Sequence, residues 1–325
     1  VVATHIEGYQ NFSTTATSPG GHAEGYTTTI SSGPGNHSEG YKTFAIGGPG
    51  CHTEGYYTSV TGGTGAHAEG QATLAYGQDA HAEGYDTKAI SDHSHAEGYQ
   101  TLSTRSNAHA EGYQTLSAGA NGHAEGCQTS CVGENSHAEG TYSLATTTSA
   151  HAEGYGTSAR GTQAVGVGSH AEGYQTCASG NYSHAEGNAT YAGGTMSHTE
   201  GYGATATGIG AHAEGQGARA TGDASHAEGS NTIANHRAQH VFGQFNIADA
   251  STVGSYMIGD YVEIVGNGKQ VQDPDTGEWT VVHSNARTLD WNGNQYIAGL
   301  QTDINGVQSI RDITLVDYEA LTPAE

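Results

Sequence analysis

The sequence predicts an all-β protein in which about 17 short coils, with a 14-residue period, stack into a parallel β-roll solenoid. The motif His-x-Glu-Gly recurs sixteen times from His5 to His226, and a seventeenth unit, His240-Val241-Phe242-Gly243, carries Phe in place of Glu. The 325 residues include 51 glycines but only four phenylalanines and two methionines, too few large apolar side chains for a conventional core. A coil of this length holds two short strands and two turns, whereas glycine at this density opposes helix.

The spacing of the motif predicts where the coils widen. Successive motif histidines are 17 residues apart once, then 15 three times, then 14 six times, then 19, and 14 from there on. Pro19, Pro34 and Pro49 each stand three residues before a motif histidine and directly before a glycine, which predicts tight turns with positive φ at those glycines. The 19-residue step contains Arg160–Gly166 and predicts a five-residue excursion, which we place within that segment.

Alternation along the motif predicts which side chains point inward. In His-Ala-Glu the alanine faces one side of the strand, and the histidine and glutamate face the other. We expect the alanine, together with residues such as Thr115, Ala118, Thr176 and Ala178, to fill a narrow interior. The histidines and glutamates then form two parallel ladders on one outer face: His22, Glu24, His67, Glu69, His81, Glu83, His95, Glu97, His109, Glu111, His123, Glu125, His137, Glu139, His151, Glu153, His170, Glu172, His184, Glu186, His198, Glu200, His212, Glu214, His226 and Glu228.

Three interpretations of the ladder are open. It is a solvated polar stripe, a set of ligands for ions such as zinc or nickel, or a buried surface at an axis shared by several chains. The unchanged His and Glu in all sixteen units favour burial, because buried polar groups must be paired and a His–Glu ladder pairs them. Metal sites are usually single constellations, so we expect no resident cofactor, with axial metal ions or waters as the alternative.

Charge and cysteine content exclude several classes of partner and site. The net charge is −24, with 33 acidic and 9 basic residues, which argues against nucleic acid as a partner. The chain contains no apolar run long enough to span a membrane, so we expect no membrane insertion. It opens within the repeat, without the features of a signal peptide, which suggests a fragment or a processed product. Cys51, Cys127, Cys131 and Cys177 form no CxxC pair and are expected to be small buried thiols rather than a disulfide or metal site.

The repeat resembles a known family. The unit S-H-A-E-G-x-x-T-x-A-x-G, over residues 5–245, is similar to the S-V-A-I-G-x-x-S-x-A-x-G repeat of YadA-type trimeric autotransporter adhesin heads. Similar repeats occur in phage and prophage tail fibres and spikes. The resemblance implies left-handed parallel β-rolls from three identical chains, with His and Glu at positions that face the centre of the trimer. That centre holds Val and Ile in the adhesins, so here it would be polar and sensitive to pH.

The last 80 residues do not follow the repeat and differ from it in composition. We predict a rod at 1–245 and a small capping β domain at 246–325, with strands at 261–265, 279–282 and 288–291. Asn292-Gly293 predicts a two-residue hairpin turn that returns through 295–298, and Leu321–Glu325 is expected to be a frayed end. The series His240–Asn246, Ile264–Gly268 and Ser284–Asn294 resembles the ends of phage tail proteins.

These features predict a non-enzymatic homotrimeric fibre of a phage or phage-like tail that attaches to a host surface. Its expected location is the virion tail or the extracellular cell surface, and its expected partners are a host receptor, with a glycan as one candidate, and further tail proteins at the N-terminal end. Candidate ligand contacts are Tyr85, Tyr99, Tyr113 and Arg160, although the tyrosine rings could instead pack on one another. The alternatives are a bacterial surface adhesin or filament, and a metal-binding His/Glu solenoid. No Ser or Cys nucleophile recurs beside the motif, which argues against an enzyme.

Overall fold

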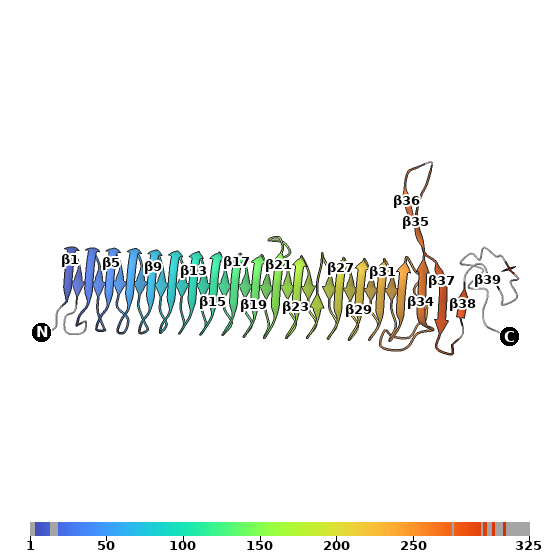
Figure 1. Cartoon of the computed structure of the whole chain (residues 1–325), viewed down its shortest axis with the longest axis horizontal. Coiled ribbons are helices and arrows are strands. Elements are labelled where there is room, and N and C mark those ends of the chain that lie inside the picture. The colour runs from blue at the N-terminus through green and yellow to red at the C-terminus, as the bar shows by residue number, and fades with distance from the viewer. Residues whose placement is uncertain are drawn as a thin grey trace. The chain divides into compact units, whose positions relative to one another are not determined.

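The computed structural model describes residues 4–13, 19–274, 276–293 and 295–297, together with the backbone of two short strands at 301–302 and 308–309. The chain divides into two compact units, Val1–Gln175 and Thr176–Glu325, and we describe each by itself. All regular elements of the described residues are β-strands (Figure 1). The all-β prediction, and the parallel solenoid of about 17 turns with a 14-residue period, are therefore confirmed.

Each coil contributes one long and one short strand. In the first unit the long strands begin at the motif histidines: β1 (His5–Tyr9), β3 (His22–Tyr26), β5 (His37–Tyr41), β7 (His52–Tyr56), β9 (His67–Gln71), β11 (His81–Tyr85), β13 (His95–Tyr99), β15 (His109–Tyr113), β17 (His123–Cys127), β19 (His137–Thr141), β21 (His151–Tyr155) and β23 (His170–Tyr174). The short strands are β2 (Phe12–Ser13), β4 (Thr29–Ile30), β6 (Phe44–Ala45), β8 (Ser59–Val60), β10 (Leu74–Ala75), β12 (Lys88–Ala89), β14 (Leu102–Ser103), β16 (Leu116–Ser117), β18 (Ser130–Cys131), β20 (Leu144–Ala145) and β22 (Gln163–Ala164).

The second unit continues the same pattern and then changes. Its strands at the motif histidines are β25 (His184–Ala185), which has only two residues, and the long strands β27 (His198–Tyr202), β29 (His212–Gln216), β31 (His226–Ser230) and β33 (His240–Gln244). Its short strands are β24 (Cys177–Ala178), β26 (Tyr191–Ala192), β28 (Thr205–Ala206), β30 (Arg219–Ala220) and β32 (Ile233–Ala234). After them come β34 (Tyr261–Asn267), β35 (Lys269–Gln272), β36 (Trp279–Val282), β37 (Asn285–Asp290), β38 (Gln295–Ile297), β39 (Gln301–Thr302) and β40 (Gln308–Ser309).

Successive coils pair in parallel and without any shift in register. Between β11 and β13, His81 lies opposite His95 and Glu83 opposite Glu97. The short strands pair in the same way, with Leu102 opposite Leu116. Every position of the repeat therefore lies next to the same position of the neighbouring coil, at the strand spacing of about 4.8 Å.

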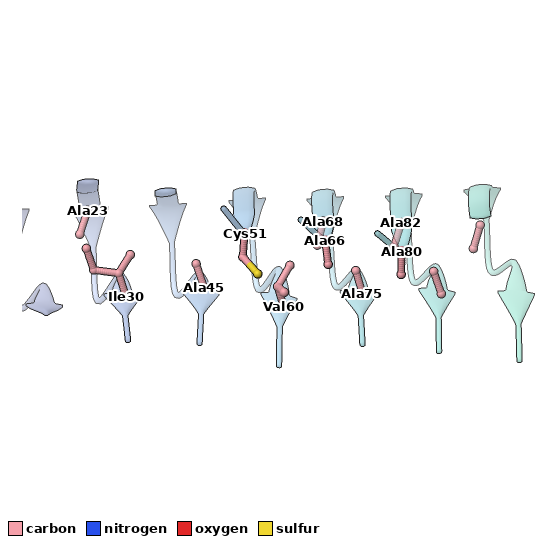
Figure 2. Close-up of a cluster of buried hydrophobic side chains, with 12 residues drawn as sticks. Ala23, Ile30, Ala45, Cys51, Val60, Ala66, Ala68, Ala75, Ala80 and Ala82 are labelled. Carbon is pink, nitrogen blue, oxygen red and sulfur yellow. The ribbon is translucent and has the colours of Figure 1, made fainter. Parts of the chain in front are cut away.

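Small side chains fill the interior of the coils. The central residue of the motif is fully buried in most coils, and it meets a buried residue of the short strand, as Ala23 and Ile30, or Ala68 and Ala75, do in Figure 2. A layer of buried threonines, including Thr115, completes the interior. The inward direction of the motif alanine and of Thr115 was predicted correctly.

One inward assignment was wrong. Ser117, and not Ala118, fills the interior in its coil, because Ser117 belongs to the short strand β16 and Ala118 is the next residue along, on the other side of the strand. Cys131 is buried at the position equivalent to Ser117, and Cys51 is also buried. All four cysteines are free, and burial raises the pKa of the Cys51 thiol.

The wider corners follow the predicted turn chemistry. Gly20, Gly35 and Gly50, which follow the three prolines, have a φ of 73° each, as a tight Pro-Gly turn requires.

The excursion in the 19-residue step lies earlier than we placed it. Gln163 pairs with Leu144 and the preceding Thr162 is buried in the interior, so the regular coil has resumed by residue 162. The five extra residues therefore lie within 156–161, a stretch where a regular coil has one residue. There the backbone N–H groups of Thr157 and Arg160 donate to each other's carbonyl oxygens at 2.9 and 3.0 Å.

The backbone conformation and the close packing of the coils explain why the fourth residue of the motif is glycine. Gly98 has a φ of 116°, and a Cβ atom at this position would overlap with the carbonyl oxygen of Gly112 in the next coil. The motif glycines of the neighbouring coils have the same arrangement. The backbone thus has a positive φ within the strand while it lies in close contact with the next coil, and only glycine allows both.

The parallel sheet of the second unit ends on longer strands. β34 pairs in parallel with β33, which places Phe242 opposite Val265, and it then pairs antiparallel with β37. Phe242 thus meets an apolar partner where the polar ladder stops. Three of the predicted strands are found, within a few residues of the expected ends, and β35, which pairs antiparallel with β36, was not anticipated.

The predicted hairpin at Asn292-Gly293 exists with a longer connection. β37 ends at Asp290 and β38 begins at Gln295, so four residues join them rather than two. Gly293 has a φ of 87°, as expected for a turn glycine. Ala298 and Leu321–Glu325 lie outside the described residues. No helix of the part that the structure describes has the length and apolar character needed to cross a bilayer. The domain boundary at residue 245 stays a prediction.

We expect substitution of a motif glycine to be far more destabilising than substitution of a corner glycine. Gly98→Ala combines a positive φ with a backbone overlap and should reduce the free energy of unfolding by about 3 kcal/mol or more. Gly50→Ala is the matched control, since Gly50 also has a positive φ but no atom lies near its missing Cβ, and its cost should be about 1 kcal/mol. Urea unfolding of both variants measures the difference, and equal costs would contradict the close-contact explanation.

Candidate functional site

The most regular polar feature of each unit is the outer face of the long strands. The pairs named above, from His22 and Glu24 in the first unit to His226 and Glu228 in the second, lie on the side of the strand opposite the buried alanine, as predicted. Their side chains are only partly covered: His67 is 29% exposed and Glu69 44%. Within a single chain the ladder is therefore neither a core nor a fully solvated surface.

The imidazole rings of neighbouring coils stack on one another. The ring centroids of His95 and His109 are 4.5 Å apart and their planes differ by 7°, and those of His109 and His123 are 4.6 Å apart. Identical residues stack because the strands pair in register. A ring such as that of His109 consequently has a parallel neighbour on both faces, whereas His52 and His67 meet edge to face with their planes 71° apart.

In the first unit each motif histidine also faces the glutamate of its own motif. Nε2 of His67, His95 and His109 lies 3.3 Å from a carboxylate oxygen of the following Glu, which is a hydrogen-bonding distance. In other coils the same two atoms are farther apart, as in His52 and Glu54 at 3.9 Å. Those Nε2 atoms, that of His52 among them, are buried yet make no hydrogen bond within the described residues.

Burial and mutual repulsion disfavour protonation of the ladder. Burial lowers the pKa of several motif histidines, and the neighbouring imidazoles lower it further, while the nearby glutamates oppose the effect. The histidines with a lowered pKa are His37, His52, His137, His151, His212 and His226.

Glutamates in the second unit interact with one another. A hydrogen bond with Glu200 raises the pKa of Glu214 to about 7, and the same hydrogen bond lowers the pKa of Glu200. Here the carboxylates also reach across coils, since the two oxygens of Glu214 approach His212 and His226 at 3.8 and 3.9 Å. The ladder is therefore less uniform than the motif suggests.

Several triads along the ladder bring three possible metal ligands together. In each, the three ligand atoms lie within 4.8 Å of one another. Within the first unit this holds for His151, Glu153 and His170. Within the second it holds for Glu186, His198 and Glu200, for His212, Glu214 and His226, and for His226, Glu228 and His240.

The candidate ligand tyrosines stack in the same way as the histidines. The rings of Tyr85, Tyr99 and Tyr113 have centroid distances of 4.9 and 5.1 Å with planes 6° apart. A neighbouring ring therefore covers each face of Tyr99, and its edge is the part left exposed. This geometry favours the packing interpretation over sugar stacking on ring faces. Arg160 is exposed at the excursion, away from these tyrosines in sequence.

A buried polar cluster in the second unit was not anticipated. His236 and Asp249 are almost fully buried, with Nε2 and Oδ1 3.9 Å apart. The Asp249 carboxylate accepts hydrogen bonds from the Gln239 side chain at 3.2 Å and from the backbone N–H groups of Tyr261 and Ser251 at 3.0 and 2.9 Å. It thereby fastens the segment before β34 to the last coil.

One sequence signal could have revealed this cluster. His236 stands four residues before a motif histidine, where the five preceding coils all carry glycine, at Gly166, Gly180, Gly194, Gly208 and Gly222. At the last four of these glycines a Cβ atom would overlap with a carbonyl oxygen of the next coil, which is that of His236 in the case of Gly222. The glycine is lost where the regular stacking ends.

Comparison with known proteins gives no relative from which a function could be transferred, because neither the protein-family models nor the curated proteins contain a match to this chain.

The first unit should lose stability on acidification. His37, His52, His137 and His151 have a lower pKa folded than the ordinary value, so the unfolded chain binds protons more readily as the pH falls through about 6.5. Stability is complete above that pH and decreases below it. We expect the melting temperature, followed by circular dichroism, to drop by several degrees between about pH 7.5 and pH 5.

Replacing both His37 and His52 by Gln should weaken this pH dependence. His93→Gln, which removes an exposed imidazole outside the motif, is the control and should retain the dependence. If the melting temperature of the wild type stays constant over the whole pH range, the histidine ladder does not make stability depend on pH.

We expect Asp249→Ala to destabilise the second unit by about 2–4 kcal/mol, because it leaves two backbone N–H groups and an amide buried without their acceptor. Asp260→Ala removes an exposed carboxylate from the same segment and should change stability by about 0.5 kcal/mol or less. Chemical unfolding followed by tryptophan fluorescence compares them. Similar effects of the two substitutions would mean that the buried cluster does not fasten this segment.

Proposed function

We propose that this chain is the shaft-forming part of a homotrimeric fibre, of the kind carried by phage or phage-like tails, that holds an attachment end at a host surface. The observation that carries the proposal is the half-buried His–Glu ladder. It is repeated in every motif, and Nε2 of several of its histidines, His52 among them, is buried without a hydrogen bond to the residues that the structure describes.

The side chains of the ladder are polar and partly buried, which supports the presence of another chain against this face. A polar atom that is buried without a hydrogen bond is costly, and native proteins rarely leave many such atoms in one row. A second and third copy, placed against the same face, would supply carboxylates and imidazoles in the same register. Identical chains suit the task because their repeats have the same 14-residue period.

The composition of the rest of the coil supports a structural role. The interior is made of alanine, serine and threonine, which allow close backbone approach but leave no large internal space. Repeats of this kind gain stability from contact with the next coil, so length can be increased without redesigning the core. This is a property expected of a spacer.

The strands after the repeats are the better candidate for attachment. The hairpin of β35 and β36 exposes Trp279, which is 64% accessible, beside Val281 and Val282. Exposed apolar groups of this size are typical of a contact surface. We propose that this end, rather than the stacked tyrosines, contacts a receptor or other fibre components. Arg160, on its loop, stays a secondary candidate.

The oligomeric state tests the proposal. Three chains of 33.3 kDa should give a mass of about 100 kDa by light scattering at neutral pH. The mass should not change with chelator, since His–Glu pairing between chains needs no ion. A monomer at neutral pH would overturn the trimeric fibre.

A pair of charge reversals tests which surface associates. Glu125→Lys places an ammonium group on the ladder and should reduce the mass to that of the monomer, because three such groups would meet at one axis. Glu134→Lys makes the same change at an exposed position outside the motif and should leave the trimer intact. A trimer with Glu125→Lys would place the interface elsewhere.

A further inference from the structure

The coils around residues 212–240 arrange the ladder differently from the central coils of the first unit. In the first unit His95 hydrogen-bonds the glutamate of its own motif at 3.3 Å. Glu214, by contrast, lies between two histidines: one oxygen is 3.8 Å from Nε2 of His212 and the other is 3.9 Å from Nε2 of His226. These separations exceed a hydrogen bond.

The same separations suit ligands of a common ion. Zinc binds imidazole nitrogen at about 2.0–2.1 Å and carboxylate oxygen at about 2.0–2.2 Å, so two ligands of one tetrahedral ion stand roughly 3.3–3.5 Å apart. One ligand atom from each of His212, Glu214 and His226 lies within 4.8 Å of the others. Binding one ion requires the Glu214 carboxyl group to rotate and the imidazoles of His212 and His226, whose ring centroids are 4.6 Å apart, to tilt toward each other.

The surroundings of His212 and His226 leave their Nε2 atoms available to bind an ion and hold both rings in place. Their Nε2 atoms are buried and make no hydrogen bond within the described part of the chain. Their rings stack at 4.6 Å with planes 12° apart, and His198 stacks on the other side of His212 at 4.7 Å. Strands β29 and β31 pair in register and fix the backbone of all three residues. Such a rigid arrangement reduces the cost of organising ligands around an ion.

We propose that His212, Glu214 and His226 bind one divalent transition-metal ion of the zinc type. Two imidazoles and one carboxylate are donors that zinc prefers, and they leave a fourth position for water. All three ligands come from one chain, so the site does not depend on the trimer. His226 also belongs to the set with Glu228 and His240, and since its Nε2 can bind one ion at a time, the two overlapping sets hold one ion between them.

The regularity of the motif hides this site in the sequence. Sixteen identical motifs argue against a metal site, because such sites are single constellations. In the structure the motifs differ from one another. In some, the glutamate hydrogen-bonds the histidine of the same motif, and in others the glutamate lies between the histidines of two coils. At Glu214, the latter arrangement brings together three ligand atoms from two imidazoles and one carboxylate.

Zinc binding by the full-length chain and a matched pair of variants tests the proposal. His226→Gln removes the histidine common to both overlapping sets, whereas His95→Gln removes a histidine that belongs to no such set among the described residues. Equilibrium dialysis against ZnCl₂ at about pH 8, where the ligands are deprotonated, gives the number of ions per chain. We expect His226→Gln to bind one ion fewer than the wild type, or to bind it at least about tenfold more weakly, and His95→Gln to match the wild type. Equal zinc binding by all three proteins would overturn the site.

A second variant distinguishes the loss of a metal ligand from a loss of folding. Glu214→Gln with Glu228→Gln keeps every histidine and the volume of both side chains, and it should lose the same ion. In the wild type, Co²⁺ should give the visible spectrum of a four- or five-coordinate ion with nitrogen ligands, weakened in the double variant and unchanged in His95→Gln. A six-coordinate Co²⁺ spectrum equal in all proteins would mean loose surface binding and would also overturn the proposal.

Discussion

Parallel, in-register hydrogen bonding between successive coils is the constraint on which the rest of this structure depends. It places each residue beside its equivalent in the next coil, at the spacing of neighbouring strands. Everything that is repeated in the sequence therefore becomes a continuous row in space. Alanine rows fill the interior, glycine rows allow the backbone to turn, and histidine and glutamate rows form the outer face.

Such rows bring identical side chains together, so neighbouring side chains within a row must neither clash nor repel one another strongly. Stacked imidazoles remain compatible while they are neutral, and their lowered pKa values express the cost of charging them side by side. The glutamate row reduces that cost through opposite charge. Where carboxylates approach one another, as Glu200 and Glu214 do, their hydrogen bond raises the pKa of Glu214 to about 7. The two rows are thus chemically interdependent, which accounts for their joint repetition in all sixteen motifs.

The end of the repeats shows what stacking requires. The position filled by glycine in five successive coils becomes His236 where the regular stacking ends, and Asp249 then binds backbone groups of the segment that leads into β34. The glutamate of the motif is replaced there by Phe242, which meets Val265 in the next strand. A solenoid needs such a transition because its last coil would otherwise expose unpaired backbone groups.

The sequence by itself determined the class of fold, the period, the inward direction of the motif alanine and the Pro-Gly corners. These properties are local or repeated, and a period of 14 with strict alternation admits few other structures. It misplaced the excursion and the inner residue of one coil, because inserted residues carry no pattern of their own and only pairing with Leu144 fixes where the coil resumes. It also treated all His–Glu motifs as equal. Only the tertiary structure decided which carboxylates hydrogen-bond their own histidine and which, like Glu214, lie between two coils, because rotation of a side chain on a shared face depends on neighbours that the motif does not encode.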